Sequence, residues 1–148
     1  MLSVDVDNRS GAVVDEAGAV ELAGKVLRGE GVGDGELGIA FVGEDEMREL
    51  KRTHLGIDEV TDVLSFPIDG RDEVPDGVPR ALGDVVLCPQ VVGDEWQWPL
   101  THGLLHLLGY DHGDEMEARE QGHLASRDVG LTESPKSEGP AWPARERE

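Results

Sequence analysis

Hydrophobic residues recur along this chain with two periods, which divide it into predicted strands and helices. Near the N-terminus Leu2, Val4 and Val6 alternate with polar residues, as in a strand with one buried face. Residues 14–28 instead repeat apolar side chains at helical spacing, with acidic residues early and basic residues late, as the helix dipole favours. The same patterns predict strands at 37–42, 63–66 and 85–88, and helices at 45–55, from the region of Pro99 to Gly109, and from 114 to about 127.

Strands and helices interleave along the chain, so we predict a single domain with a four-stranded sheet and helices packed on it. A chain of 148 residues is long enough for one such core. We assign this domain to residues 1–131. The remaining segment, 132–148, is polar and rich in proline, and we predict that it forms a disordered tail.

The most informative stretch is THGLLHLLGYDH at residues 101–112. His102 and His106 are four residues apart, so on a helix they share one face with Cβ atoms about 5–6 Å apart. Leucines occupy most of the other positions, which is typical of a buried helix. A histidine pair there needs a metal ion or a hydrogen-bond partner. Gly109 favours a helix end, after which the chain can turn back and bring His112 to the pair.

Three imidazoles at this spacing predict a metal site formed by His102, His106 and His112. Zinc with three protein ligands keeps its fourth position for water, which distinguishes a catalytic site from a closed structural one. The alternative is that each histidine is a core side chain bonded to a carbonyl, which we disfavour for three histidines together. We therefore expect one Zn²⁺ ion as cofactor, although nickel and copper also suit such ligands.

The spacing also suggests a peptidase. Metzincin peptidases carry the pattern H-E-x-x-H-x-x-G-x-x-H, and this chain has the three histidines and the glycine. Gly103 stands where the glutamate of that pattern, the general base, would be. We therefore expect a hydrolytic zinc site and disfavour ordinary peptidase activity.

Three stretches, taken in order, resemble one known family. Residues 102–112, HGLLHLLGYDH, resemble the signature of the YbeY family, the bacterial endoribonucleases of ribosomal RNA maturation. Residues 61–67, TDVLSFP, and residues 82–88, LGDVVLC, resemble two further segments of that family. The resemblance implies an α+β fold with a mixed sheet and a zincin-like metal helix packed against it.

The same resemblance implies a biochemical role. We expect a zinc-dependent endoribonuclease that cuts single-stranded RNA during ribosomal RNA maturation and ribosome biogenesis. The expected partners are the ribosomal RNA precursor, the small ribosomal subunit and an Era-like GTPase. The remaining alternative is a non-enzymatic ribosome-assembly factor whose zinc only holds the fold together.

Two features depart from the family. An arginine common in the family is replaced by Leu55, and Arg52 is the nearest guanidinium, so Arg52 is a hypothetical substitute. The connection at 89–101 is shorter than usual, which implies that the metal helix lacks its early turns or the helix before it. Within this connection, we expect Trp96 and Trp98 to cover the core rather than to stack on RNA bases.

The catalytic base is not evident from the sequence. Asp111 adjoins the third histidine, and either accepts a proton or orients a histidine. Asp84 and Ser65 belong to the resembling segments, but both also suit the ends of strands. We expect His54 and His123 to be surface side chains.

Charge makes RNA binding unfavourable for the chain as a whole. Thirteen basic residues stand against 32 acidic ones, for a net charge of −19, whereas RNA binders commonly gain affinity by neutralising phosphates. Arg48, Lys51 and Arg52 would share one helix face. That face is either an RNA-facing patch or an ordinary solvated surface.

Composition also bears on the compartment. Cys88 is the single cysteine and ends an apolar strand, so we expect a buried, inert thiol in a reducing environment. No apolar run approaches the ~20 residues that span a bilayer, and the N-terminus has no secretory pattern. We therefore expect a cytoplasmic protein with no membrane partner.

Overall fold

The computed structural model describes residues 2–70, 73–110 and 113–125. The predicted tail, 132–148, lies outside these ranges. The elements in chain order are β1 (Leu2–Asn8), α1 (Glu16–Gly29), β2 (Gly35–Phe41), α2 (Glu44–Leu55), β3 (Val63–Pro67), β4 (Ala81–Leu87), α3 (Pro89–Val92), α4 (Gln97–Leu107) and α5 (Asp114–Ala125).

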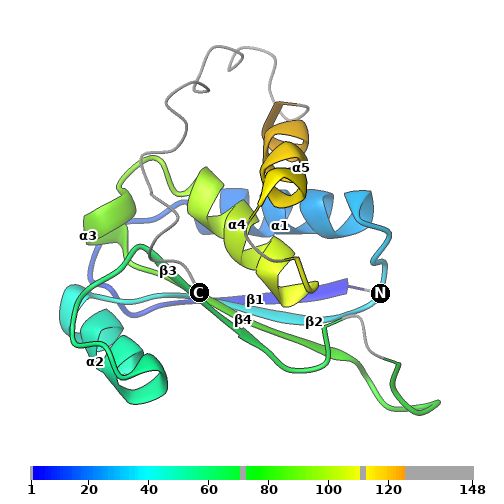
Figure 1. The fold of residues 1–148 in the computed structure, drawn as a ribbon, viewed down its shortest axis with the longest axis horizontal. Coiled ribbons are helices and arrows are strands. Elements are labelled where there is room, and N and C mark those ends of the chain that lie inside the picture. The colour runs from blue at the N-terminus through cyan, green and yellow to red at the C-terminus, as the bar shows by residue number, and fades with distance from the viewer. Residues whose placement is uncertain (1, 71–72, 111–112, 126–148) are drawn as a thin grey trace.

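The four strands form one mixed sheet in the order β1-β2-β4-β3 (Figure 1). β1, β2 and β4 run parallel, and β3 pairs antiparallel with β4 at the edge. Parallel neighbours require crossovers, which explains why helices separate the predicted strands along the chain. The predicted α+β architecture with a four-stranded mixed sheet is confirmed.

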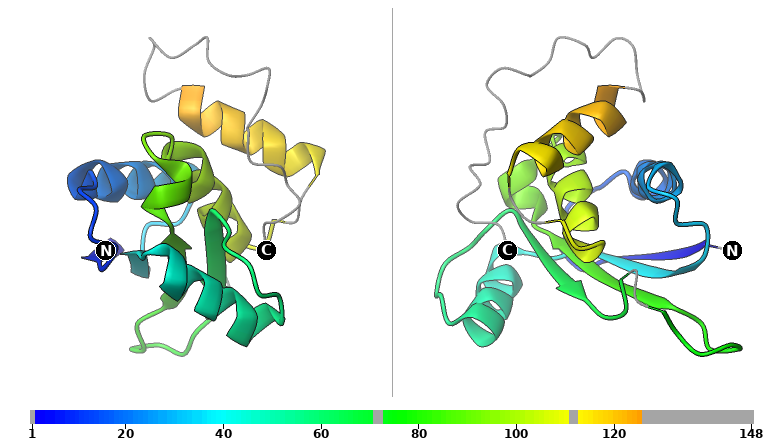
Figure 2. Two further views of the ribbon diagram at one scale, coloured as in Figure 1. Left: turned by 90° about the vertical axis from the view of Figure 1, so that its left-hand side faces the viewer. Right: turned by 45° about the vertical axis from the view of Figure 1, so that its right-hand side comes forward.

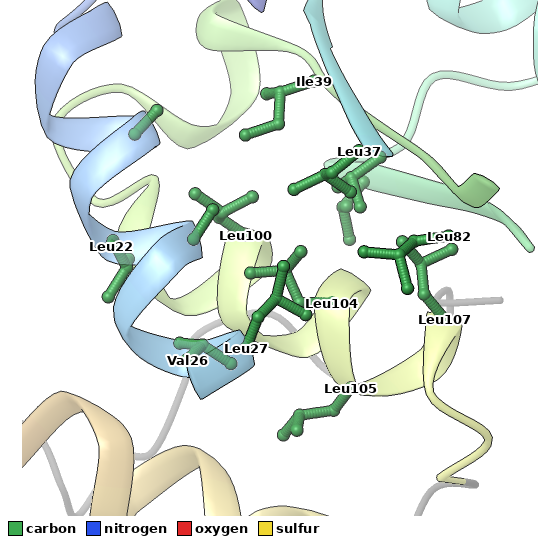
Figure 3. Packing of buried hydrophobic residues seen from close by; sticks show 14 of the residues in the cluster. Leu22, Val26, Leu27, Leu37, Ile39, Leu82, Leu100, Leu104, Leu105 and Leu107 are labelled. Atoms are coloured by element: carbon green, nitrogen blue, oxygen red, sulfur yellow. The ribbon is translucent and has the colours of Figure 1, made fainter. Parts of the chain in front are cut away.

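The larger core lies between the sheet and two helices, α1 and α4 (Figures 1 and 2). α5 packs on these two helices from outside, mainly on α4, and so forms a further layer. Figure 3 shows how leucines of α1 and α4 meet side chains of β2 and β4. Burial of this apolar surface is the main favourable term that holds α4 in place.

A smaller core lies on the opposite face of the sheet, between the sheet and α2 (Figure 1). Val85 and Leu87 of β4 enter the larger core, while Val86 and Cys88, the residue just after the strand, enter the smaller one, because alternate side chains of an extended chain point to opposite faces. Cys88 is fully buried as predicted, and this burial raises the pKa of its thiol. A thiol that stays protonated is a weak nucleophile.

β4 begins at Ala81, whereas the sequence predicted a strand only from residue 85. The pairing of β4 with β2 shifts register next to Leu37, so that Leu82 has no partner on β2. Because of this shift the Leu82 side chain is buried, although strict alternation from Val85 would point it to the other face of the sheet. Gly83 has a φ of +139°, and a Cβ there would lie 2.5 Å from the Phe66 carbonyl oxygen. Gly83, which interrupts the run of apolar residues in β4, is therefore the residue that permits this irregular pairing with β2.

The connection before α4 is compact. It contains a single helical turn, α3, and α4 then begins at Gln97, five residues ahead of His102. Pro99 lies in the first turn, where its missing N–H is tolerated. Trp96 packs against the larger core, as expected. Among the described residues, no helix has both the length and the apolar character needed to cross a membrane.

Candidate metal centre

The centre is built on α4, the most deeply buried helix of the fold. Leucines at 100, 104, 105 and 107 are almost fully buried, so most of the helix surface is committed to packing. His102, 7% exposed, and the half-buried His106 lie one turn apart on this helix. Their ring centroids are 4.7 Å apart and the rings are nearly perpendicular, at 86°. The predicted histidine pair is thus brought together.

Each of the two imidazoles is held at its Nδ1 atom by another part of the protein. His102 Nδ1 bonds to the buried Glu120 carboxylate on α5. His106 Nδ1 lies 2.9 Å from the carbonyl oxygen of Tyr110, and because a carbonyl only accepts, His106 must donate from Nδ1. With both Nδ1 atoms engaged, Nε2 is the atom that each ring would offer to a metal. A carboxylate or carbonyl on the far nitrogen is the usual support of a metal-binding histidine, so this pair fits a divalent ion.

The third predicted ligand, His112, lies outside the described residues, as does Asp111. Within 2–70, 73–110 and 113–125, no three His, Cys, Asp or Glu side chains form a group that could hold a metal. The structure does describe the turn that leads to His112. Gly109 has a φ of +100°, as predicted for a helix end, and the Tyr110 N–H then bonds back to the Leu105 carbonyl.

Gly103 faces the sheet and not the histidine pair. A Cβ at this position would lie 2.8 Å from Val85 Cγ1, 3.0 Å from Ser65 Oγ and 3.2 Å from Val63 Cγ2. Ser65 Oγ also donates a 3.0 Å hydrogen bond to the Gly103 carbonyl, which pins α4 to β3. A glutamate therefore has no room at 103, and the structure offers a packing reason why the base of a metzincin peptidase is missing.

A second buried carboxylate, Glu30 at the C-terminal end of α1, lies behind the centre. Its side chain is only 2% exposed. It accepts a 2.8 Å hydrogen bond from the Tyr110 hydroxyl and a 2.6 Å bond from His123 Nε2, and Arg119 Nη1 is 3.6 Å away. The prediction that His123 is a surface residue is therefore wrong: its side chain is 13% exposed, because the ring is drawn to Glu30.

The environment of Glu30 changes its acidity. Burial alone would raise the pKa of this carboxyl group. The hydrogen bonds from His123 and Tyr110, together with the positive charge of Arg119, outweigh burial and hold the pKa of Glu30 below its ordinary value. Glu30 is therefore ionised at neutral pH, and its charge stabilises the groups around it.

The basic residues of α2 do not form a positive patch. Lys51 is 2% exposed and pairs with Glu59 at 3.0 Å. Arg48 pairs with Asp58 at 2.8 Å, and Arg52 with Glu49 at 2.6 Å. Each positive charge is thus balanced by a carboxylate, and α2 packs on the sheet face opposite α4 (Figure 1). This placement counts against the hypothesis that Arg52 replaces the arginine of the related family.

The other sequence candidates have ordinary structural roles. Asp84 is exposed and covers Gly38 on the sheet face away from α4, so it is not part of the centre. Ser65 secures α4 through the Gly103 carbonyl. His54 is an exposed side chain, as expected, with its ring 4.9 Å from that of Phe66.

Comparison with known proteins supports one family. A family model described as Endoribonuclease YbeY matches residues 5–127. The Endoribonuclease YbeY of Salinispora tropica is 36% identical, over 92% of this chain and 99% of that protein. The protein of the same name from Beutenbergia cavernae is 42% identical, over 80% and 89%. A Thermotoga maritima protein solved in solution shares the fold with a TM-score of 0.58 at 23% identity, over 95% of this chain and 99% of that one.

The packing of Gly103 makes a stability prediction. We expect Gly103→Ala to destabilise the protein by about 1–3 kcal/mol, because the added methyl overpacks the contact with β3 and β4. Gly122 on α5 is a matched control, since nothing lies within 4 Å of its Cβ position. Gly122→Ala should stabilise by up to about 1 kcal/mol through helix propensity. Urea unfolding measures both, and equal effects would show that Gly103 is not tightly packed.

The lowered pKa of Glu30 predicts a pH dependence. An ionised carboxylate with a depressed pKa contributes stability at neutral pH that is lost as the pH falls through its folded value. Glu30→Gln should therefore unfold at lower urea than wild type at pH 7, and the gap should narrow below the ordinary value of 4.5. Glu21→Gln, on the exposed side of α1, should stay within about 0.5 kcal/mol of wild type throughout. A gap that stays constant down to pH 3 would contradict the assignment.

Proposed function

The chain belongs to the YbeY endoribonuclease family, and from this premise we propose that it cuts single-stranded RNA with one zinc ion held by His102, His106 and His112. The observation that carries the zinc proposal is the histidine pair on α4, with each Nδ1 engaged by a protein acceptor. Imidazoles prepared in this way suit zinc. The substrate we propose is ribosomal RNA precursor, so the reaction belongs to ribosomal RNA maturation in the cytoplasm.

The protein's contribution to such a reaction is mainly one of position. When bound, zinc supplies an activated water near neutral pH and polarises a phosphoryl oxygen. Glu120 and the Tyr110 carbonyl hold the two ligand rings at their Nδ1 atoms, which reduces the ordering that metal binding requires. The packing of Gly103 on β3 and β4 holds the helix itself. We keep Asp111, next to His112, as the candidate for the proton acceptor or for orienting a ligand.

The acidic character of the chain bears on how RNA reaches the centre. With a net charge of −19 and the α2 cations already paired, phosphate neutralisation contributes little affinity. We therefore propose that binding partners bring the RNA to the centre, namely the small ribosomal subunit, which contains that RNA, and an Era-like GTPase. Peptidase activity is not proposed, because Gly103 leaves no room for the required glutamate.

The test of this function combines metal analysis with RNA cleavage. We expect His106→Ala to lose stoichiometric zinc and to cut single-stranded ribosomal RNA at least about a hundredfold more slowly, because metal catalysis contributes several kcal/mol. His54→Ala removes an exposed histidine on α2 and should behave like wild type. Casein should not be cleaved by either protein. Zinc loss without loss of cleavage would refute a catalytic metal, whereas zinc-loaded wild type that cuts no RNA would favour the non-enzymatic alternative with a structural zinc.

Glu120 should influence zinc affinity through His102. Glu120→Ala removes the acceptor of the His102 Nδ1 bond, and we expect zinc affinity to fall about 10–100-fold. Glu120→Gln keeps an acceptor but loses the charge, so its zinc affinity should lie between that of wild type and that of Glu120→Ala. Glu117→Ala removes an exposed carboxylate from the same helix and serves as the control. Competition with a chromophoric chelator measures all four proteins, and equal affinities for Glu120→Ala and Glu117→Ala would contradict this role.

A further inference from the structure

Glu30 joins three separate parts of the chain at one buried carboxylate. It belongs to the end of α1, while its partners come from the turn after α4 and from α5. Its side chain is nearly inaccessible to water, and a buried carboxylate is stable only where donors surround it. The bond to His123 links α1 to α5, whereas the bond to Tyr110 leads toward the histidine pair.

Tyr110 is the point at which this cluster meets the metal centre. Its hydroxyl donates to Glu30 at 2.8 Å, and its carbonyl oxygen accepts the Nδ1 proton of His106 at 2.9 Å. Arg119 lies over its ring, 5.9 Å from the centroid. Gly109 immediately before it has a φ of +100°, a conformation that favours glycine and turns the chain back at the end of α4. Two contacts of Tyr110 thus locate the carbonyl that orients His106: its own N–H, bonded to the Leu105 carbonyl, and its hydroxyl, anchored on Glu30 at the end of α1.

We propose that Glu30 is a positioning residue of the metal centre, which acts through Tyr110 to hold the His106 ring in its ligand orientation. This inference rests on the proposed function, since it concerns the same zinc site. By fixing Tyr110, Glu30 also fixes the residue from which the chain continues toward His112. α1 contributes no predicted metal ligand, but through Glu30 it helps to hold the His106 ring in place.

A purely structural role for Glu30 makes a different prediction. If the carboxylate only ties helices together, then removing either of its donors should have equivalent effects on the site. If it acts through Tyr110, the Tyr110 bond should matter to His106 and the His123 bond should not. The two donors therefore provide a matched pair, because each contributes one hydrogen bond to the same carboxylate.

The experiment compares Tyr110→Phe with His123→Phe in the full chain. The first readout is the nitrogen-15 chemical shifts of His106 in zinc-free protein, which report which ring nitrogen carries the proton. The second is the zinc dissociation constant from chelator competition. We expect Tyr110→Phe to shift His106 from the Nδ1-protonated form toward a mixture and to weaken zinc binding about tenfold. His123→Phe should leave both readouts at the wild-type values.

The outcomes separate this inference from the proposed function. Wild type that binds no zinc refutes the proposed function, while the His106 shifts still test the role of Glu30. Changes in Tyr110→Phe alone support the inference. Equal changes in both variants, or none in Tyr110→Phe, overturn it. If Tyr110→Phe does not fold, Glu30→Gln takes its place, with the same readouts and the same criteria against His123→Phe.

Discussion

The burial of α4 between the sheet and α5 is the constraint on which the rest of this structure depends. A helix lined with leucine is stable only when most of its surface is covered, yet this one also carries two imidazoles. Buried polar groups require partners. Glu120 and the Tyr110 carbonyl meet that requirement, and in doing so they place α5 and the turn after α4 beside the helix.

The two other segments that resemble the YbeY family, residues 61–67 and 82–88, contribute the strands on which α4 packs. Residues 63–67 of the first segment form β3 and residues 82–87 of the second lie in β4, the two strands on which α4 rests. Ser65 bonds to the helix backbone, and Gly83 allows Leu107 Cδ2 to approach within 2.9 Å of its Cβ position. These residues thus serve the placement of the histidine helix rather than the chemistry directly.

Local patterns in the sequence were sufficient for much of this fold. Periodicity identified the strands and the main helices, and Gly109 marked the end of α4 because only a local conformation was involved. The spacing of His102 and His106 likewise predicted their shared face. The order of the strands, and the early start of β4, depend on pairing with β2 and were not evident from local sequence.

The support of the centre could not be predicted, because its partners are distant in the chain. Glu120 lies 18 residues from His102, and Glu30 lies 80 residues from Tyr110. Among 32 acidic residues, no spacing distinguishes these two from exposed ones. The same limit applies to Lys51, which shares a predicted helix face with two arginines but is buried beside the sheet. Which carboxylates become buried is decided only when the helices pack.

The coordination shell of the metal gives the most direct test of the central claim, that a buried helix presents two prepared imidazoles to one ion. Zinc-edge X-ray absorption on the purified protein should show nitrogen or oxygen donors at about 2.0–2.1 Å. The outer-shell scattering should correspond to three imidazoles. A sulfur donor near ~2.3 Å, or scattering from fewer than two imidazoles, would contradict the account.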